Sequence, residues 1–323
     1  MNVWLNPTMR HHTTRFLLLA LVMSLGVSPA FAAGHKIGVL LKGRTKFWSV
    51  VEQGALTAGE KLGAEVIVKT PPTESDIAVQ ILMLNALAAS GVEAIVIAPG
   101  HKVTLAQPVA ALAAKGIKFI VIDSPLAGNV SSAFIGTNHR AAGETAGRLL
   151  AGLVKESDEV SLFRHLQDNA ATGDREDGAL AKLREAHPKI SVHGDIYAGN
   201  EKEVQVERAK LLLAKYPGTK GILASSTPGT MVMLDVLSHH EPVGAIKLVG
   251  FGFNLNEEVA AALDAGTMHG WIAQQPREIG ARGVEAAVDI LNGKAVPPVI
   301  NVDVFVVTKD NLHDPKTQAL LKL

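Results

Sequence analysis

The chain has 323 residues, which suggests two domains on a prior of roughly 150 residues per domain. Apolar residues make up 47% of the sequence and charged residues 19%, which excludes a disordered polymer and predicts a globular protein with an extensive core. The sequence has 31 Lys and Arg residues and 31 Asp and Glu residues, so it has no excess of positive charge. Binding to nucleic acid or to an anionic membrane is therefore not expected. Cysteine is absent, which excludes disulfides, thiol nucleophiles and zinc–thiolate sites.

The first residues carry the features of an export signal. Arg10 and Arg15 precede an apolar run over residues 16–27, and Ala30-Phe31-Ala32 follows it. An apolar run of this length is too short to span a bilayer. We therefore predict a signal peptide over residues 1–33 that is cleaved to release a soluble periplasmic protein, with an uncleaved membrane anchor as the alternative.

From residue 35 onward, short β-branched apolar runs alternate with amphipathic segments, the pattern of consecutive βαβ units. Strands are predicted at 37–41, 64–69, 94–98, 119–123, 133–135, 159–162, 190–193, 221–224, 246–250 and 302–307. Helices are predicted at 47–62, 76–90, 103–115, 139–155, 174–186, 201–215, 230–239, 257–265 and 276–292. Because the strands are continuously apolar, each sheet is expected to be parallel and covered on both faces. The sequence therefore predicts an α/β fold of two similar doubly wound parallel-sheet lobes.

Ligands of doubly wound sheets bind beyond the carboxyl ends of the strands, where the loops converge. The loops expected there are 42–48, 99–102, 123–125, 164–175, 225–230 and 250–256. The sequence contains no His-Glu-x-x-His, Gly-x-Ser-x-Gly or Gly-x-Gly-x-x-Gly motif. We therefore expect a binding protein without catalytic activity, metal or cofactor.

Several segments resemble one known family. They are residues 36–40 followed by Phe47-Trp48 and Gly54-Ala55, residues 91–99, and residues 249–251 followed by 270–276 and Ile279-Gly280. These segments resemble the ribose-binding-like type I periplasmic binding proteins, which are solute receptors of ABC importers. The resemblance implies two lobes that close over a ligand like a Venus flytrap.

The same resemblance implies where the lobes begin and end. The chain is expected to cross between the lobes near Thr137, Gln275 and Val299. The N-terminal lobe would then contain residues 34–136 and 275–298, and the C-terminal lobe residues 137–274 and 299–323.

A sugar presents apolar C–H faces and a rim of hydroxyls, so its site needs an aromatic plate with charged or amide side chains around it. Phe47 or Trp48 is predicted to stack on the ligand, although either could instead cap the core. The resemblance implies ligand contacts for Asp123, Gln274 and Arg175. The alternatives are a turn-forming role for Asp123 and a helix-surface ion pair for Arg175.

The chain also departs from the family. Where the family commonly has Asn-Asp after one strand and Asp after Gly250-Phe251, this chain has Ser226-Thr227 and Gly252-Phe253-Asn254. Two sets of polar side chains that would bind ligand hydroxyls in the family are therefore missing. The smaller side chains in their place predict a larger ligand, or water molecules in the space that they leave. We expect Ser226, Phe253 and Asn254 to line the site, with Phe253 as a candidate second plate.

Lys42, Arg44 and Lys46 form a basic cluster in the first of these loops. An anionic ligand, such as a sugar acid, would use such a cluster. Solvated surface charge is the interpretation that we favour.

The predicted function is that of a monomeric periplasmic protein that captures a sugar, a polyol or a related small hydroxylated molecule. It would deliver this ligand to an ABC permease and would not bind nucleic acid. The alternative is a periplasmic sensor that presents its ligand to a membrane receptor kinase.

Overall fold

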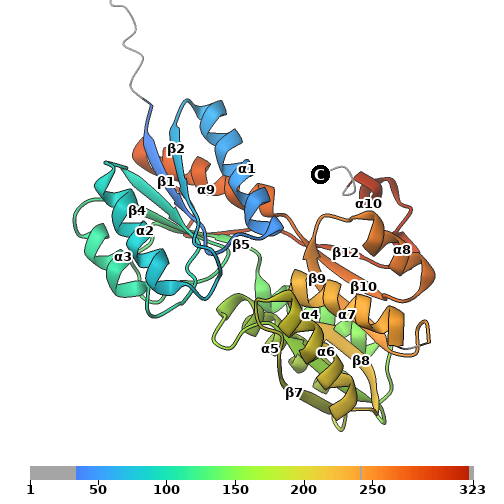
Figure 1. The fold of residues 1–323 in the computed structure, drawn as a ribbon. Coiled ribbons are helices and arrows are strands. Elements are labelled where there is room, and N and C mark those ends of the chain that lie inside the picture. The colour runs from blue at the N-terminus through green and yellow to red at the C-terminus, as the bar shows by residue number, and fades with distance from the viewer. Residues whose placement is uncertain (1–33, 241, 320–323) are drawn as a thin grey trace, which may run out of the picture. The chain divides into compact units, whose positions relative to one another are not determined.

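The computed structural model describes residues 34–240 and 242–319. Within these residues the chain forms two six-stranded sheets, each with helices on both faces, and we call each sheet with its helices a lobe (Figure 1). The predicted signal peptide lies outside the described residues. In the part of the chain that is described, no helix is both long enough and apolar enough to cross a bilayer.

The sheet of the N-terminal lobe has the strand order β2-β1-β3-β4-β5-β11, and its strands are parallel. This order places the ligand crevice of a doubly wound sheet beside β1 and β3. The strands are β1 (Lys36–Leu40), β2 (Glu65–Lys69), β3 (Ala94–Ile97), β4 (Lys118–Ile122), β5 (Ala133–Gly136) and β11 (Val299–Asn301).

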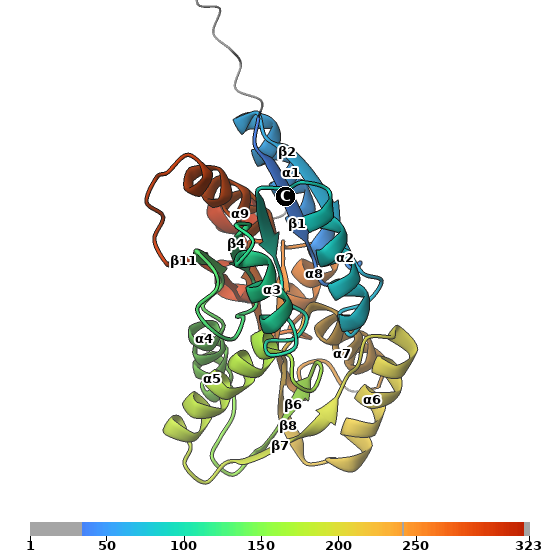
Figure 2. The same cartoon turned by 90° about the vertical axis from the view of Figure 1, so that its left-hand side faces the viewer.

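Helices cover both faces of this sheet, as the views of Figures 1 and 2 show. One face packs against α1 (Lys46–Leu62) and α9 (Pro276–Leu291), and the other against α2 (Ile77–Ala89) and α3 (Ala106–Ala113). Alternate residues of a strand point to opposite faces: Ile120 and Ile122 of β4 enter the first core, whereas Phe119 and Val121 enter the second. Because both faces are covered, the central strands β1, β3 and β4 are apolar along most of their length.

The C-terminal lobe repeats this plan with the order β7-β6-β8-β9-β10-β12. Its strands are β6 (Glu159–Arg164), β7 (Ser191–Tyr197), β8 (Thr219–Ala224), β9 (Lys247–Phe253), β10 (Gly270–Gln274) and β12 (Phe305–Val307), of which β12 runs antiparallel to β10. Its helices are α4 (His139–Ala151) and α5 (Ala170–Ala186) on one face, and α6 (Lys202–Lys215), α7 (Thr227–His240) and α8 (Glu257–Ala265) on the other. The chain continues through η1 (Lys309–Asn311) and α10 (Pro315–Ala319). The predicted fold class of two doubly wound α/β lobes is confirmed.

The described chain crosses between the sheets at three places. It leaves the first sheet between β5 and α4, where Thr137 lies, and returns between β10 and α9, where Gln275 lies. The crossover predicted near Val299 is placed too early, because β11 pairs with β5 in the first sheet. The chain therefore changes sheet only after Asn301.

The predicted elements differ from the observed ones mainly at the C-terminal end. Strands β10 and β11 were not predicted, and only the last three residues of the strand predicted at 302–307 form β12. These strands are held by pairing with β9, β5 and β10 rather than by a strong apolar pattern of their own. Such pairing depends on tertiary contacts, which local periodicity does not reveal.

Candidate functional site

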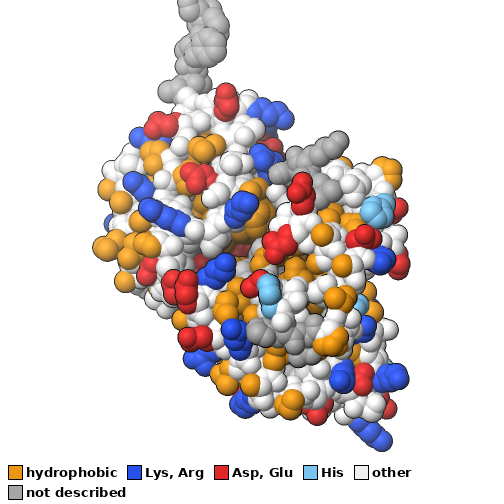
Figure 3. All heavy atoms as spheres, turned by 45° about the vertical axis from the view of Figure 1, so that its right-hand side comes forward, with side chains coloured by type: hydrophobic (Ala, Val, Ile, Leu, Met, Phe, Trp, Pro, Cys, Tyr) orange, Lys and Arg blue, Asp and Glu red, His pale blue; other side chains and the backbone are white. Residues whose placement is uncertain are grey.

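A cavity of about 940 Å³ lies between the two lobes, at the carboxyl ends of their strands. Figure 3 shows apolar side chains that reach the surface on both sides of the hollow between the lobes. All eight predicted site residues line this cavity: Phe47, Trp48, Asp123, Arg175, Ser226, Phe253, Asn254 and Gln274. Whether they contact a ligand stays a prediction.

The loop at 99–102 was expected to contribute but does not line the cavity. Gln80 of α2 fills the space at the ends of β1 and β3, where its amide nitrogen donates to the carbonyls of Leu41 and Ala98 at 2.9 and 2.8 Å. Its amide oxygen accepts from the backbone of Gly100. Gln80 thus satisfies strand-end groups that would otherwise be buried without partners.

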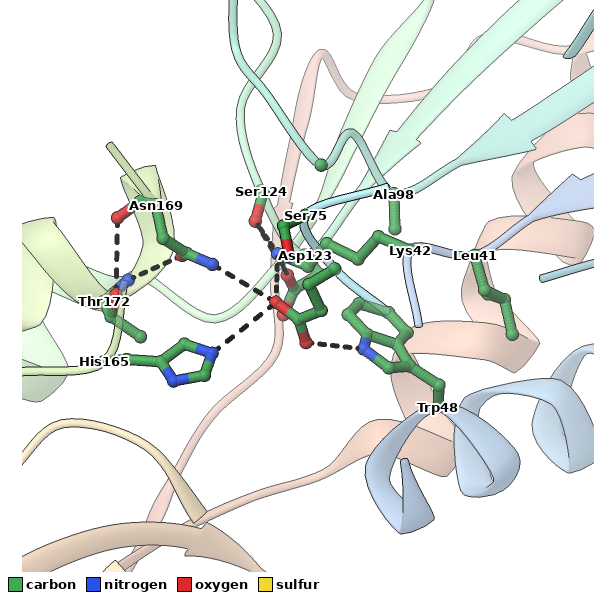
Figure 4. A network of polar contacts seen from close by, with 12 residues as sticks. Leu41, Lys42, Trp48, Ser75, Ala98, Asp123, Ser124, His165, Asn169 and Thr172 are labelled. Atoms are coloured by element: carbon green, nitrogen blue, oxygen red, sulfur yellow. Dashed lines mark hydrogen bonds and ion pairs between the residues drawn. The ribbon is translucent and has the colours of Figure 1, made fainter. Parts of the chain in front are cut away.

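The floor of the cavity in the N-terminal lobe is built on Lys42 and Asp123, which follow β1 and β4 (Figure 4). The Lys42 ammonium lies 3.0 Å from Oδ2 of Asp123 and donates to the Ser124 hydroxyl at 2.6 Å. Ser124 in turn donates to Oδ2 of Asp123 at 2.8 Å. Lys42 is only 3% exposed, so the favoured interpretation of it as solvated surface charge is wrong. Arg44 and Lys46, by contrast, are exposed at the mouth of the cavity.

Asp123 is held in an unusual backbone conformation, with φ at 62°. Asp and Asn tolerate this left-handed region better than other residues with a Cβ atom. Burial alone would raise the pKa of the Asp123 carboxyl, but the charges of Lys42 and Arg175 outweigh it and lower that pKa. The carboxylate is therefore ionised at neutral pH and available as an acceptor.

Arg175 lies on the opposite side of the floor, in α5 of the C-terminal lobe, and is 4% exposed. It donates to Nδ1 of His139 at 3.2 Å, to the carbonyl of Ser225 at 2.9 Å and to Oε1 of Gln274 at 2.6 Å. Its guanidinium also lies 4.7 Å from the ring of Phe251. The alternative of a helix-surface ion pair is wrong, since Arg175 is buried at the cavity.

The position of Arg175 depends on close packing between α4 and α5. A Cβ atom at Gly143 would lie 2.1 Å from the carbonyl oxygen of Arg175, so only glycine allows the two helices to approach this closely. Burial lowers the pKa of Arg175 to about 10, opposed by Asp123, Glu74 and Glu176. Arg175 therefore carries its charge at neutral pH.

His139, the first residue of α4, connects the two halves of the floor. Because a carbonyl only accepts and a guanidinium only donates, its Nε2 donates to the carbonyl of Asp123 at 2.8 Å, and its Nδ1 accepts from Arg175. The ring is therefore neutral. Burial and then the charge of Arg175 lower its pKa to about 3.

Glu74, in the loop after β2, lines the cavity and links the two lobes through its hydrogen bonds. It accepts from the indole nitrogen of Trp48 at 2.8 Å and from the side chain of Asn169, in the other lobe, at 3.2 Å. Its Oε2 also lies 3.9 Å from both Lys42 and His165. Burial would raise the pKa of Glu74, but Lys42, His165 and the Trp48 hydrogen bond outweigh it and hold that pKa well below its usual range.

Aromatic rings from both lobes meet across the cavity. The ring of Phe47 lies edge-on to that of Trp48, with centroids 4.9 Å apart, and edge-on to that of Phe253 at 5.5 Å. Trp48 is 2% exposed, whereas Phe47 and Phe253 are only partly buried. Phe47 and Phe253 are therefore the rings with surface left for a ligand.

Sequence reasoning missed several residues of the site. Glu74, His139, His165, Asn169 and Trp271 lie at the cavity or in its polar network, yet none was predicted. Glu74 and Asn169 each lie in a loop after a strand of the predicted pattern, and this signal was available for both. His139 and Trp271 had no such signal, because their roles depend on contacts between the lobes' elements.

The chemistry of the described residues is that of a binding site. Among residues 34–240 and 242–319, no three His, Asp or Glu side chains converge in a way that could hold a metal ion. The cavity instead brings together paired charges, amides and aromatic rings. Such a set offers both donors and acceptors to a polar molecule and a flat apolar surface to its carbon skeleton.

Comparison with known proteins agrees with this geometry. A family model described as a periplasmic binding protein domain matches residues 37–295. The chain belongs to the periplasmic binding protein domain family. The resemblance expected from the sequence is thereby confirmed.

Curated relatives of this periplasmic binding protein match over most of their length. The D-allose-binding periplasmic protein of Escherichia coli (strain K12) is 27% identical, over 87% of this chain and 91% of the relative. A ribose import binding protein of Haemophilus influenzae is 25% identical, over 91% of this chain and 98% of the relative.

Solved structures share the fold. A carbohydrate transporter solute-binding protein from Agrobacterium radiobacter, in complex with D-arabinose, superimposes with a TM-score of 0.84 at 26% identity, over 90% of this chain and 99% of that one. An ABC transporter solute-binding protein from Agrobacterium vitis, bound with α-D-tagatopyranose, has a TM-score of 0.81 at 25% identity, over 89% and 99% of the two chains.

Proposed function

We propose that this protein captures a neutral monosaccharide or polyol between its lobes and delivers it, unchanged, to an ABC importer in the membrane. The relatives named above are sugar-binding proteins of transport systems, which supports transport rather than catalysis. The family and the export signal predicted at residues 1–33 support a periplasmic location.

The observation that carries the proposal is the balance of charge at the floor of the cavity. Two cations, Lys42 and Arg175, face two anions, Glu74 and Asp123, and all four side chains are largely buried. An anionic ligand would need an excess of positive charge at this depth, whereas hydroxyl groups can accept from the cations and donate to the carboxylates. The balanced floor therefore favours a neutral, hydroxyl-rich ligand.

Aromatic and polar side chains are proposed to bind different parts of the ligand. Phe47 is proposed to stack on a C–H face of the sugar, and the edge contact with Trp48 fixes the position of the Phe47 ring. Asp123 is proposed to accept from hydroxyls of the ligand. The amide oxygen of Gln274 accepts a hydrogen bond from Arg175. Its amide nitrogen is proposed to donate to the ligand. A single monomer supplies all of these groups.

A thermal-shift screen of the purified protein against neutral pentoses, hexoses and polyols tests the proposal. A ligand present at about 100 times its dissociation constant adds about 2.7 kcal/mol to the free energy of unfolding, which raises the melting temperature measurably. The matching sugar acids serve as the charged control. The proposal fails if no neutral compound stabilises the protein, or if only the acids do.

A further inference from the structure

Two loops from different lobes meet far from the three crossovers, which form the hinge. One loop, at 70–76, follows β2, and the other, at 198–201, follows β7. β2 and β7 are the outermost strands of their sheets, whereas the crossovers begin at β5, β10 and β11, at or beside the opposite edges. Four or five strand spacings of about 4.8 Å each therefore separate the two loops from the hinge, or about 20 Å.

A side-chain hydrogen bond joins the two loops. Nδ2 of Asn200 donates to Oγ of Ser75 at 2.6 Å. Ser75 is exposed and does not line the cavity, whereas Asn200 does. A change at Ser75 therefore alters the contact between the lobes without altering the lining of the cavity.

Each loop is held in place by bonds within its own lobe. In the first loop, Oδ2 of Asp76 accepts from the backbone nitrogen and the hydroxyl of Thr73 at 2.8 and 3.0 Å. In the second loop, Nε2 of Gln205, which is 1% exposed, donates to the carbonyls of Gly199 and Asn200 at 2.8 and 3.4 Å. Both loops are therefore ordered before the lobes meet, which lowers the entropic cost of joining them.

The loop at 70–76 makes a second contact with the other lobe, through Glu74 and Asn169 at 3.2 Å. Glu74 also lines the cavity and lies close to the Lys42 ammonium, so a change there would alter the ligand site as well. The bond between Ser75 and Asn200 can be tested without this complication.

The distance from the hinge makes this bond sensitive to opening. Rotating one lobe by about 10° about the crossovers would move the two loops apart by about 3 to 4 Å. A hydrogen bond of 2.6 Å does not survive such a displacement. The bond therefore forms only in the closed protein and must break before the lobes open.

We propose that Ser75 and Asn200 form a latch that holds the lobes closed and thereby sets the rate at which a bound sugar is released. This inference rests on the proposed function, because it concerns how long the same cavity keeps its ligand. The sugar enters while the latch is open. Loss of the latch should therefore raise the dissociation rate and leave the association rate unchanged.

Stopped-flow fluorescence of the two cavity tryptophans measures both rates, with D-ribose, D-allose and D-arabinose as probes. Ser75→Ala and Asn200→Ala should each raise the dissociation rate about threefold to tenfold, the effect of one hydrogen bond. The double variant should release the sugar no faster than the single variants, because all three lack the same bond. Ser90→Ala, at the other end of α2, is the matched control and should change neither rate. Unchanged dissociation in both single variants, or effects that multiply in the double variant, would overturn the proposal.

Cross-linking tests the latch without a bound sugar. The sequence has no Cys, so Ser75→Cys together with Asn200→Cys places one thiol on each loop and none elsewhere. Dibromobimane, which becomes fluorescent when it joins two thiols, should cross-link this pair. It should not cross-link Ser90→Cys together with Asn200→Cys, because the length of α2 places Ser90 about 20 Å from the loop at 70–76.

The cross-linking results separate the latch from the proposed function. Absence of the fluorescent product in the first pair, or equal yields in the two pairs, would overturn the latch whether or not a sugar binds. Cross-linking of the first pair alone, in a protein that binds no neutral sugar, would instead overturn the proposed function and with it the role of the latch in sugar release.

Discussion

The ammonium of Lys42 lies 3.0 Å from Oδ2 of Asp123, and the side chain of each is 4% exposed. The two residues follow β1 and β4, which lie on either side of β3 in the sheet. Neither charge would be tolerated alone at this depth, because removing an ion from water costs several kcal/mol unless a partner compensates it. The pair therefore stabilises the floor of the cavity as well as preparing it for a ligand.

Replacing Lys42 by Met should leave the Asp123 carboxylate buried without its main counter-charge. The free energy of unfolding is expected to fall by about 3 kcal/mol at neutral pH, as for other buried pairs that lose one partner. Urea denaturation measures this change. Lys46→Met, at an exposed position in the same region, serves as the control and should change stability by less than about 0.5 kcal/mol. Equal stability of the two variants would contradict the proposed role of the pair.

Replacing Asp123 by Asn should remove the charge while keeping the backbone conformation, since Asn also tolerates a φ of 62°. Sugar binding is expected to weaken by about 2 kcal/mol, the contribution of a charge-assisted hydrogen bond. Titration calorimetry with the tightest ligand of the screen measures this loss. Asp235→Asn, on the exposed side of α7, is the matched control. Unchanged affinity in Asp123→Asn would show that Asp123 does not contact the ligand.

The stability of the protein should decrease in mild acid because of His139. Its pKa in the folded protein is about 3, below the ordinary value of 6.5, so the unfolded chain binds a proton more readily between these values. Stability must therefore fall as the pH drops below about 6.5, by about 2 kcal/mol between about pH 7 and about pH 5 from this residue. Glu74 and Asp123 have lowered pKa values, so their contributions are lost only at still lower pH.

His139→Gln isolates this effect. A glutamine can donate to the carbonyl of Asp123 and accept from Arg175 but has no proton to gain. Denaturation curves of this variant at the two pH values should differ by about 2 kcal/mol less than those of the unchanged protein. If both proteins lose the same stability in acid, His139 is not the residue responsible.

The lobes should separate more readily when Asn169 is replaced by a carboxylate that repels Glu74. Asn169→Asp keeps the side-chain oxygen that accepts from the backbone of Thr172 at the start of α5, but it turns the hydrogen bond to Glu74 into a contact between two carboxylates. Small-angle scattering of the unliganded variant should show a larger radius of gyration, and its sugar affinity should fall about tenfold.

Asn169→Ser is the control for that variant. Serine keeps the helix cap but is too short to reach Glu74, so it should give an intermediate radius and an intermediate affinity. Scattering curves of Asn169→Asp and of the unchanged protein that superimpose would show that this contact does not hold the lobes together.

Most of the fold follows from the sequence because both faces of each sheet are covered. Strands such as β3 and β4 are continuously apolar for this reason, and the pattern locates them within a few residues. Strands β10, β11 and β12 were missed or misplaced because they depend on pairing with strands distant in the sequence. Local patterns carry no information about such partners.

The site was predictable where a residue lies in or beside a loop that follows a strand, or where the family resemblance points to it. Asp123 was placed at the cavity by both kinds of reasoning, and Arg175, which lies in α5, mainly by the resemblance. Lys42 was misinterpreted because a charged residue beside Arg44 and Lys46 suggests solvent exposure, and only the fold brings Asp123 within reach of it. Trp271 was missed because its place at the cavity depends on the pairing of β10 with β9, which local patterns do not reveal.

The central claim is that the two lobes hold a sugar between them without changing it. Small-angle scattering of the purified protein, with and without the tightest neutral sugar of the screen, tests this claim most directly when the sugar is recovered and identified afterwards. The account predicts a smaller radius of gyration in the saturated protein and full recovery of the original sugar. Identical scattering with every sugar, or the appearance of a reaction product, would contradict it.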